Sequence, residues 1–150
     1  MGAMELGHVN LWVGGLDRSA TFYRDVLGFT EVARGVLNGR KVAFFSLGTR
    51  HHDLALVEAP GATAQGGPPR LGLNHIGLKV GTGLDDLRRI RDALIAGGVT
   101  PSRYVEHRVC QSMHVDDPDG NTIELYVDAD PPIWARDPQS IVCSEPLMLA

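Results

Sequence analysis

The sequence predicts an α+β fold made of two tandem βαβββ modules. The first observation is an internal repeat, in which a histidine-led run of alternating aliphatic residues at 7–17 recurs at 74–85. The second observation is that a Gly-rich turn, a helical pattern and three further strand patterns follow each copy. The copies lie too far apart for a solenoid, so we interpret them as one duplicated module. The strands are expected to form a curved mixed sheet around a shared interior.

The domain is expected to span residues 5–128, with modules at about 5–58 and 73–128. Residues 59–72 are rich in Gly, Pro and Ala, which indicates a linker between the modules. Residues 129–150 form a C-terminal tail. The pattern leaves two roles open for this tail, as a cover for a sheet edge or for a partner subunit.

In the first module, the alternation over residues 6–13 predicts a half-buried strand. A helix is expected at about 18–27, capped by Asp17 and ended by Gly28. The dipeptide Asn38-Gly39 is a strong hairpin signal between two later strands. The three later strands are expected at Thr30–Val36, Lys41–Leu47 and His52–Glu58.

In the second module, we expect a strand at Leu73–Val80 and a helix at Leu84–Ala96 that stops at Gly97-Gly98. The later strands are expected near Arg103–His107, Gln111–Val115 and Thr122–Val127. The acidic run at 116–121 predicts a tight turn before the last strand. It lacks the loop length and the terminal glutamate of a calcium site.

Composition is that of an ordinary globular protein, with 43% hydrophobic and 21% charged residues. A net charge of −4 gives no reason to expect nucleic acid or an anionic membrane as a partner. No apolar run approaches the about 20 residues that span a bilayer, and the start lacks a secretory pattern. The two cysteines form no CxxC pair. We therefore expect reduced thiols in a cytoplasmic protein.

Strand parity places three polar residues on equivalent faces. His8 and His75 stand opposite the aliphatic positions of their strands, and Glu124 stands opposite Ile123 and Leu125. If that face lines a concave interior, the chain presents two imidazoles and a carboxylate to it. Two histidines and a carboxylate with open positions are the ligands of non-haem Fe(II) oxygenases, and similar ligands hold Mn²⁺ or Zn²⁺. The sequence therefore predicts a metal-site cavity inside the curved sheet.

Several stretches carry a resemblance to a known family. They are His8, the run FYRDVLGF at 22–29, the run LNHI at 73–76 and the run DPDGNTIELY at 117–126. Over about residues 5–128 the chain resembles the vicinal oxygen chelate superfamily. This superfamily includes glyoxalase I, fosfomycin-resistance proteins, bleomycin-binding proteins and extradiol ring-cleavage dioxygenases. The resemblance implies paired βαβββ modules and metal ligands at His8, His75 and Glu124.

One stretch favours the extradiol dioxygenase branch. The run HHDLA at 51–55 is similar to the His-His-x-Leu-Ala run of those enzymes. Its second histidine, here His52, acts there as an acid–base group. Glyoxalase I instead has a fourth ligand, a glutamate, on this strand, and the matching position here is Ala55. Glu58 is the nearby carboxylate, and its register is wrong for a ligand.

Two further histidines are candidates for the reaction. His107 resembles the dioxygenase histidine that hydrogen-bonds the hydroxyl oxygen of the substrate. His114 occupies a position where those enzymes usually have a tyrosine. An imidazole can also donate a hydrogen bond to a catecholate, although it titrates near neutrality where a phenol does not. The catalytic candidates are therefore His52, His107 and His114.

The resemblance implies a metal-dependent extradiol-type dioxygenase that cleaves a small catechol-like aromatic substrate with O₂. Fe(II) is the expected metal, and ligand identity does not separate it from Mn²⁺, Zn²⁺ or Ni²⁺. The family also implies a homodimer. Two alternatives stay open: a glyoxalase-like lyase or thiol transferase on the same scaffold, and a metal-free protein that binds a drug or another small ligand.

Overall fold

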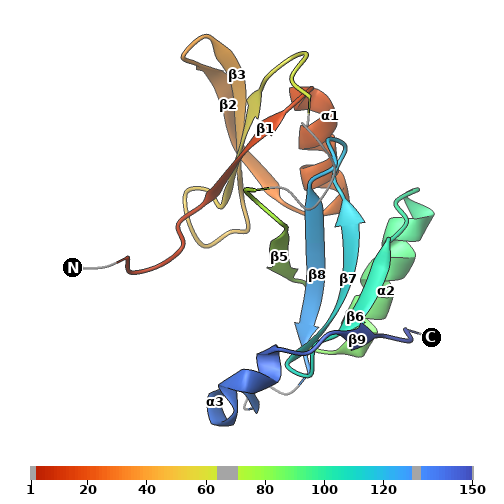
Figure 1. Cartoon of the computed structure of the whole chain (residues 1–150). Coiled ribbons are helices and arrows are strands. Elements are labelled where there is room, and N and C mark those ends of the chain that lie inside the picture. The colour runs from red at the N-terminus through yellow and green to blue at the C-terminus, as the bar shows by residue number, and fades with distance from the viewer. Residues whose placement is uncertain (1–2, 64–70, 130–132, 150) are drawn as a thin grey trace. The chain divides into compact units, whose positions relative to one another are not determined.

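The computed structural model describes residues 3–63, 71–129 and 133–149. The chain divides into two compact units, residues 1–70 and residues 71–150. Each unit contains one sheet (Figure 1) and is described by itself. None of the described helices combines the length and the apolar character needed to cross a membrane.

The sheet of the first unit has the strand order β1-β4-β3-β2. Strand β1 (Val9–Val13) lies parallel to β4 (Leu54–Glu58). Strand β3 (Arg40–Ser46) is antiparallel to β4 and to β2 (Thr30–Leu37). The β2–β3 hairpin turns at Asn38-Gly39, and both residues have the positive φ that this two-residue turn requires. The hairpin signal in the sequence is therefore confirmed.

The first helix begins earlier than predicted and changes form halfway. It starts as α1 (Leu16–Thr21) and continues as a π-helical turn, η1 (Phe22–Val26). Tyr23 is buried in this turn, with its ring edge-on to that of Phe29. Gly28 has a φ of 76° and follows the helix, as the sequence predicted.

The predicted cap of this helix is wrong. The N-cap residue is Gly15, with no side-chain hydrogen bond, and Asp17 lies inside the first turn. The backbone N–H of Leu16 instead donates to Glu58 Oε1 at 3.0 Å. The carboxylate at the end of β4 thus satisfies one of the free N–H groups of the helix. This contact gives the Glu58 carboxylate a structural role at the start of α1, which accounts for the residue without a role in metal binding.

The sheet of the second unit has the order β5-β8-β7-β6-β9. Strand β5 (Ile76–Lys79) lies parallel to β8 (Thr122–Asp128). Strand β7 (Cys110–Asp116) is antiparallel to β8 and to β6 (Arg103–Glu106). The first four strands of this sheet repeat the order and directions of the first unit. The α+β class and the two βαβββ modules are therefore confirmed.

Alternation along β8 separates two faces of the second sheet. Ile123, Leu125 and Val127 are buried, and helix α2 (Leu84–Ala96) packs on β8 and β7 (Figure 1). Glu124 lies on the opposite side of the strand and is partly exposed. The strands form one sheet in each unit, and the predicted metal-site cavity stays a prediction.

The turn before β8 is confirmed, and its acidic side chain stabilises the turn itself. Asp117 is buried, and its Oδ1 accepts hydrogen bonds from the backbone N–H of Asp119 at 2.9 Å and of Asn121 at 2.8 Å. Its Oδ2 accepts from the Asn121 amide at 2.9 Å. A carboxylate with these partners belongs to the turn, in keeping with the prediction that this run is no calcium site.

The C-terminal tail covers a sheet edge, which is one of the two roles that the sequence left open. Strand β9 (Glu145–Pro146) pairs antiparallel with β6 (Figure 1). The tail also contains α3 (Ile133–Arg136) and a 3₁₀ turn, η2 (Pro138–Ile141). The second sheet is therefore one strand wider than the module predicts.

Candidate functional site

Glu124 lies at the centre of three imidazoles in the second unit. Its carboxylate oxygens lie 3.3 Å from Nε2 of His75, 3.5 Å from Nε2 of His107 and 3.9 Å from Nε2 of His114. His75 immediately precedes β5, His107 immediately follows β6, and His114 belongs to β7. The Glu124 side chain is only 14% exposed, so water screens these contacts weakly.

Strand register explains how these residues meet. Glu124 on β8 pairs with His114 on β7 and with Gly77 on β5. His114 pairs in turn with Arg103 on β6. Directly opposed residues of neighbouring strands lie close enough for their side chains to contact. Gly77 has no side chain, and a Cβ there would come within 3.7 Å of Glu124 Oε2, so the row stays uncrowded at this end.

Two of the imidazoles are fixed by oxygen acceptors. His75 Nδ1 donates to Asn74 Oδ1 at 2.6 Å, and His107 Nδ1 donates to the backbone carbonyl of Cys143 at 2.6 Å. These oxygens only accept hydrogen bonds, so each Nδ1 carries a proton. In the neutral ring, Nε2 then presents a lone pair towards Glu124.

This arrangement fits a cation. Imidazole lone pairs and carboxylate oxygens repel one another at these distances unless a proton or a metal ion lies between them. Neutral imidazole and carboxylate are also the ligands that divalent iron, manganese and zinc accept. Metal-binding histidines commonly donate their other N–H to an oxygen, as His75 does. No group of three or more His, Cys, Asp or Glu among the described residues is arranged to hold a metal by itself, and His8 belongs to the first unit.

His114 is buried and held in the neutral form. Its Nε2 accepts a hydrogen bond from Arg103 Nη2 at 3.1 Å, and a guanidinium can only donate. The proton of the ring is therefore on Nδ1, which is buried and has no partner among the described residues. Burial, followed by the charge of Arg103, lowers the pKa of His114. The imidazole at the expected tyrosine position is thus neutral, with its N–H buried and its Nε2 on the side of Glu124.

A second histidine cluster lies in the first unit. The ring of His52 is 4.5 Å from that of His8 and 4.5 Å from that of His51, measured between centroids. Phe44 on β3 lies edge-on to His52 at 5.3 Å. Burial, followed by the neighbouring imidazoles, lowers the pKa of His52. A ring that is neutral near pH 7 can accept a proton, which suits the acid–base role predicted for His52.

Ala55 occupies the position in the first unit that Glu124 occupies in the second. Ala55 on β4 pairs with Asn10 on β1, just as Glu124 pairs with Gly77. The side chain is buried and apolar. The first unit therefore supplies no carboxylate at the strand position where glyoxalase I is expected to have its fourth ligand.

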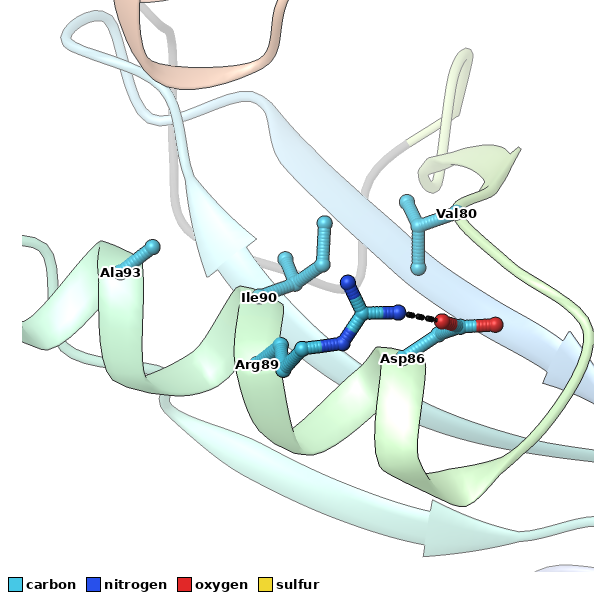
Figure 2. A pocket seen from close by; sticks show the side chains of 5 residues that line it. All are labelled: Val80, Asp86, Arg89, Ile90 and Ala93. Carbon is cyan, nitrogen blue, oxygen red and sulfur yellow. Dashed lines mark hydrogen bonds and ion pairs between the residues drawn. The ribbon is translucent and has the colours of Figure 1, made fainter.

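A separate hollow of about 160 Å³ lies between Val80 and helix α2 (Figure 2). Its charged groups pair with each other, because Arg89 contacts Asp86. The Asp86 carboxylate also accepts from the Thr82 backbone N–H at 2.7 Å, which ties the turn before the helix to its first turn. A Cβ at Gly81 would collide with Asp86, so glycine is required there. The Gly-Thr-Gly run thus serves the start of a helix.

Sequence patterns missed three contributors to the cluster around Glu124. Arg103 stands opposite His114, a register that follows only from the strand pairing. Asn74 is adjacent to His75 in the chain, so its contact could have been suspected from the sequence. The contribution of Cys143 comes from its backbone carbonyl and leaves no signal in residue type.

Comparison with known proteins identifies the family. The model of the glyoxalase/bleomycin resistance protein/dioxygenase superfamily matches residues 5–125, so the chain belongs to this superfamily. A biphenyl-2,3-diol 1,2-dioxygenase of Rhodococcus globerulus is 31% identical over 124 residues, which cover 83% of this chain and 63% of that protein. The chain thus spans less than two thirds of the length of this curated relative.

Solved structures share the fold. A glyoxalase/bleomycin resistance protein/dioxygenase domain from Frankia sp. EAN1pec has a TM-score of 0.71 at 24% identity, covering 85% of this chain and 99% of that one. A fosfomycin resistance protein from Listeria monocytogenes, solved with Mn(II) and sulfate, has a TM-score of 0.63 at 18% identity, covering 85% and 95%. At these identities the likeness concerns the fold alone.

Proposed function

We propose that this chain is a metal-dependent, extradiol-type dioxygenase that cleaves the ring of a small catechol-like diol. The observation that carries the proposal is the convergence of His75, His107 and His114 on the Glu124 carboxylate. The likeness to a biphenyl-2,3-diol dioxygenase supports the same class of reaction. The proposed metal ligands are His8, His75 and Glu124, with Fe(II) as the metal.

Fe(II) held by His8, His75 and Glu124 would supply a Lewis acid for the diol oxygens and a redox-active centre for O₂. The remaining groups of the second unit handle protons and hydrogen bonds. His107 has a free Nε2 lone pair, because its Nδ1 proton is engaged by the Cys143 carbonyl, and it accepts a proton from a substrate hydroxyl. His114 is proposed to help place the substrate from the side of its Nε2, which lies 3.9 Å from Glu124 Oε1 and accepts from Arg103.

His52 is the proposed acid–base group of the first unit. Its pKa is lowered by burial and by the adjacent imidazoles, so the ring is unprotonated at neutral pH and has a nitrogen lone pair available as a proton acceptor. The rings of His8, His51 and Phe44 contact it and restrict its orientation. A positioned acid–base group of this kind contributes about 10²–10⁴ to the rate of a reaction.

The alternative enzymes on this scaffold have less support. A glyoxalase-like lyase is expected to have a fourth carboxylate ligand, and the equivalent position is the buried Ala55. The likeness to a fosfomycin resistance protein, at 18% identity, concerns the fold alone and does not favour a thiol transferase. A metal-free protein that binds a small ligand remains the alternative from a different class, and it predicts ligand binding that a chelator leaves unchanged.

The test combines metal content with a substrate panel. Protein purified without chelator is analysed for metals, loaded anaerobically with Fe(II), and mixed with catechol and biphenyl-2,3-diol under O₂. We expect stoichiometric iron and the visible absorbance of a ring-cleavage product, both abolished in Glu124→Gln. A protein that takes up no metal but binds diols equally well in the presence of a chelator would contradict the proposal.

A further inference from the structure

The imidazole of His107 is held by a segment that lies outside the family region. The family model ends at residue 125, whereas the carbonyl that accepts the His107 Nδ1 proton belongs to Cys143. We propose that residues 142–146, called here the C-terminal strap, position His107 by fixing its proton on Nδ1 and directing Nε2 towards Glu124. This inference rests on the proposed function, because it assigns the strap to the same site.

The strap is fastened along the edge strand β6. Its residues 145 and 146 pair with Glu106 and Val105, and the Leu147 N–H donates to the Tyr104 carbonyl at 3.3 Å. The Arg91 guanidinium of α2 donates to the carbonyl of Leu149. On its other side, the Cys143 N–H donates to the carbonyl of Ile141 at 2.9 Å. Cys143 is therefore held on both sides, and its carbonyl has a defined position.

The strap contributes backbone hydrogen bonds more than apolar packing. Val142 is 76% exposed, and Glu145 and Pro146 are exposed as well. Because hydrophobic stabilisation is roughly proportional to the apolar area buried, removal of the strap should have a small effect on folding. Its contact with His107 can therefore be tested separately from the stability of the second unit.

A fixed proton matters because the two ring nitrogens have opposite roles. With the proton on Nδ1, the ring satisfies the Cys143 carbonyl and keeps an acceptor at Nε2, 3.5 Å from Glu124 Oε1. In the other tautomer, the Nδ1 lone pair would face the carbonyl oxygen and the hydrogen bond would be lost. The strap thus selects the tautomer in which His107 accepts a substrate proton. It acts through His107 and needs no contact with the substrate.

The decisive experiment compares two truncations of the full chain. Deletion of residues 142–150 removes the Cys143 carbonyl, whereas deletion of residues 147–150 keeps both Cys143 and β9. Histidine ring nitrogens are observed by long-range ¹H–¹⁵N spectra of labelled protein, with His107→Gln to assign the signals. We expect separate Nδ1–H and unprotonated Nε2 signals in the native chain and the short truncation. In the long truncation the two shifts should converge as the tautomers exchange.

Kinetics provide a second readout. Loss of a group that orients a reactive imidazole typically costs about 10- to 100-fold in activity. We expect kcat to fall by this factor in the long truncation, with KM little changed, and neither value to change in the short one. Far-UV circular dichroism verifies that both truncated chains fold.

Two outcomes would overturn the strap proposal. One is a native protein in which the His107 proton lies on Nε2, a measurement that needs no variant. The other is a folded long truncation with unchanged ring signals and unchanged kcat. The tautomer does not depend on turnover, so a fixed Nδ1 proton in a protein without dioxygenase activity would contradict the proposed function alone.

Discussion

The two units have the same strand order but different residues at equivalent positions. In the second unit, the row that crosses β5, β8, β7 and β6 consists of Gly77, Glu124, His114 and Arg103. In the first unit, the equivalent row consists of Asn10, Ala55, Phe44 and Ala33. One row presents a carboxylate, an imidazole and a guanidinium, whereas the other is almost entirely apolar. Duplication thus repeated the scaffold, and within these two equivalent rows the ionisable side chains lie in the second unit.

The two sheets also differ at the edge that β6 forms in the second unit and β2 forms in the first. In the second unit, β9 covers β6 and the tail also supplies the carbonyl bound to His107. In the first unit, the edge strand β2 has β3 as its one strand neighbour within the described ranges, and Val36 is largely exposed. An uncovered edge presents unpaired backbone groups to solvent. The tail therefore extends the second sheet and contacts His107.

We call the row with Glu124, His114 and Arg103 the polar row, and the row with Ala55 and Phe44 the apolar row. The largest effect is expected from removing the charge of Glu124 in the polar row. Glu124→Gln preserves shape but removes the charge that the imidazoles face, so affinity for Fe(II) should fall by at least about 100-fold. Ala55→Ser at the equivalent position of the apolar row should leave this affinity unchanged. Anaerobic titration with a chelating dye measures both. Equal affinities for Fe(II) in native and Glu124→Gln protein would contradict a role for Glu124 in metal binding.

The next largest effect is expected in the first unit, where the proposed acid–base residue His52 lies just before strand β4. His52→Gln should lower kcat by about 10²–10⁴-fold while metal content stays native, because His52 is assigned a proton and no metal. His51→Gln should have a smaller effect on kcat. Steady-state kinetics with parallel metal analysis measure both variants. Loss of metal in His52→Gln would contradict the assignment of His52 to proton transfer alone.

A smaller effect is expected from making the polar row resemble the apolar one. His114→Phe introduces the residue found at the equivalent position 44. It removes a buried N–H without a partner among the described residues and leaves the exposed Arg103 to water. The free energy of unfolding of the metal-free protein should therefore change by no more than about 1 kcal/mol. A decrease of several kcal/mol in the free energy of unfolding, measured with urea, would show that His114 stabilises the folded chain.

The smallest effect concerns a thiol of the second unit. Burial, followed by the charge of Glu124, raises the pKa of Cys110 from 9.0 to about 11. Stability from this protonated thiol is fully present below pH 9.0 and is lost as pH rises through about 11. In Cys143→Ser, which keeps the backbone carbonyl, iodoacetamide should modify Cys110 slowly at neutral pH. Rapid modification there, detected by mass spectrometry, would contradict the burial of this thiol.

Strand parity and the repeat were sufficient to predict much of the fold and part of the site. The period of two residues along a strand determines which face a side chain takes, so Glu124 is opposite Ile123 and Leu125, as predicted. Ala55, which the family resemblance matched to the fourth-ligand position of glyoxalase I, lies at the register equivalent to that of Glu124. The face of Glu124 depends on a local pattern, whereas the match of Ala55 came from the resemblance.

The remaining features depend on contacts between distant parts of the chain. Asp17 has the residue type of a helix cap, but Glu58 supplies the acceptor from another strand. Arg103 meets His114 only through the pairing of β6 with β7. The hydrogen bond of His107 to Cys143 uses a backbone carbonyl, which every residue type possesses. Local sequence patterns cannot predict such partners.

We propose that His8, His75 and Glu124 together bind one divalent metal ion. The most direct measurement is the metal stoichiometry of anaerobically Fe(II)-loaded native protein, His8→Ala and His75→Ala after removal of free metal. We expect one iron per native chain and loss of bound iron in both variants. Full retention of iron in either variant would contradict it.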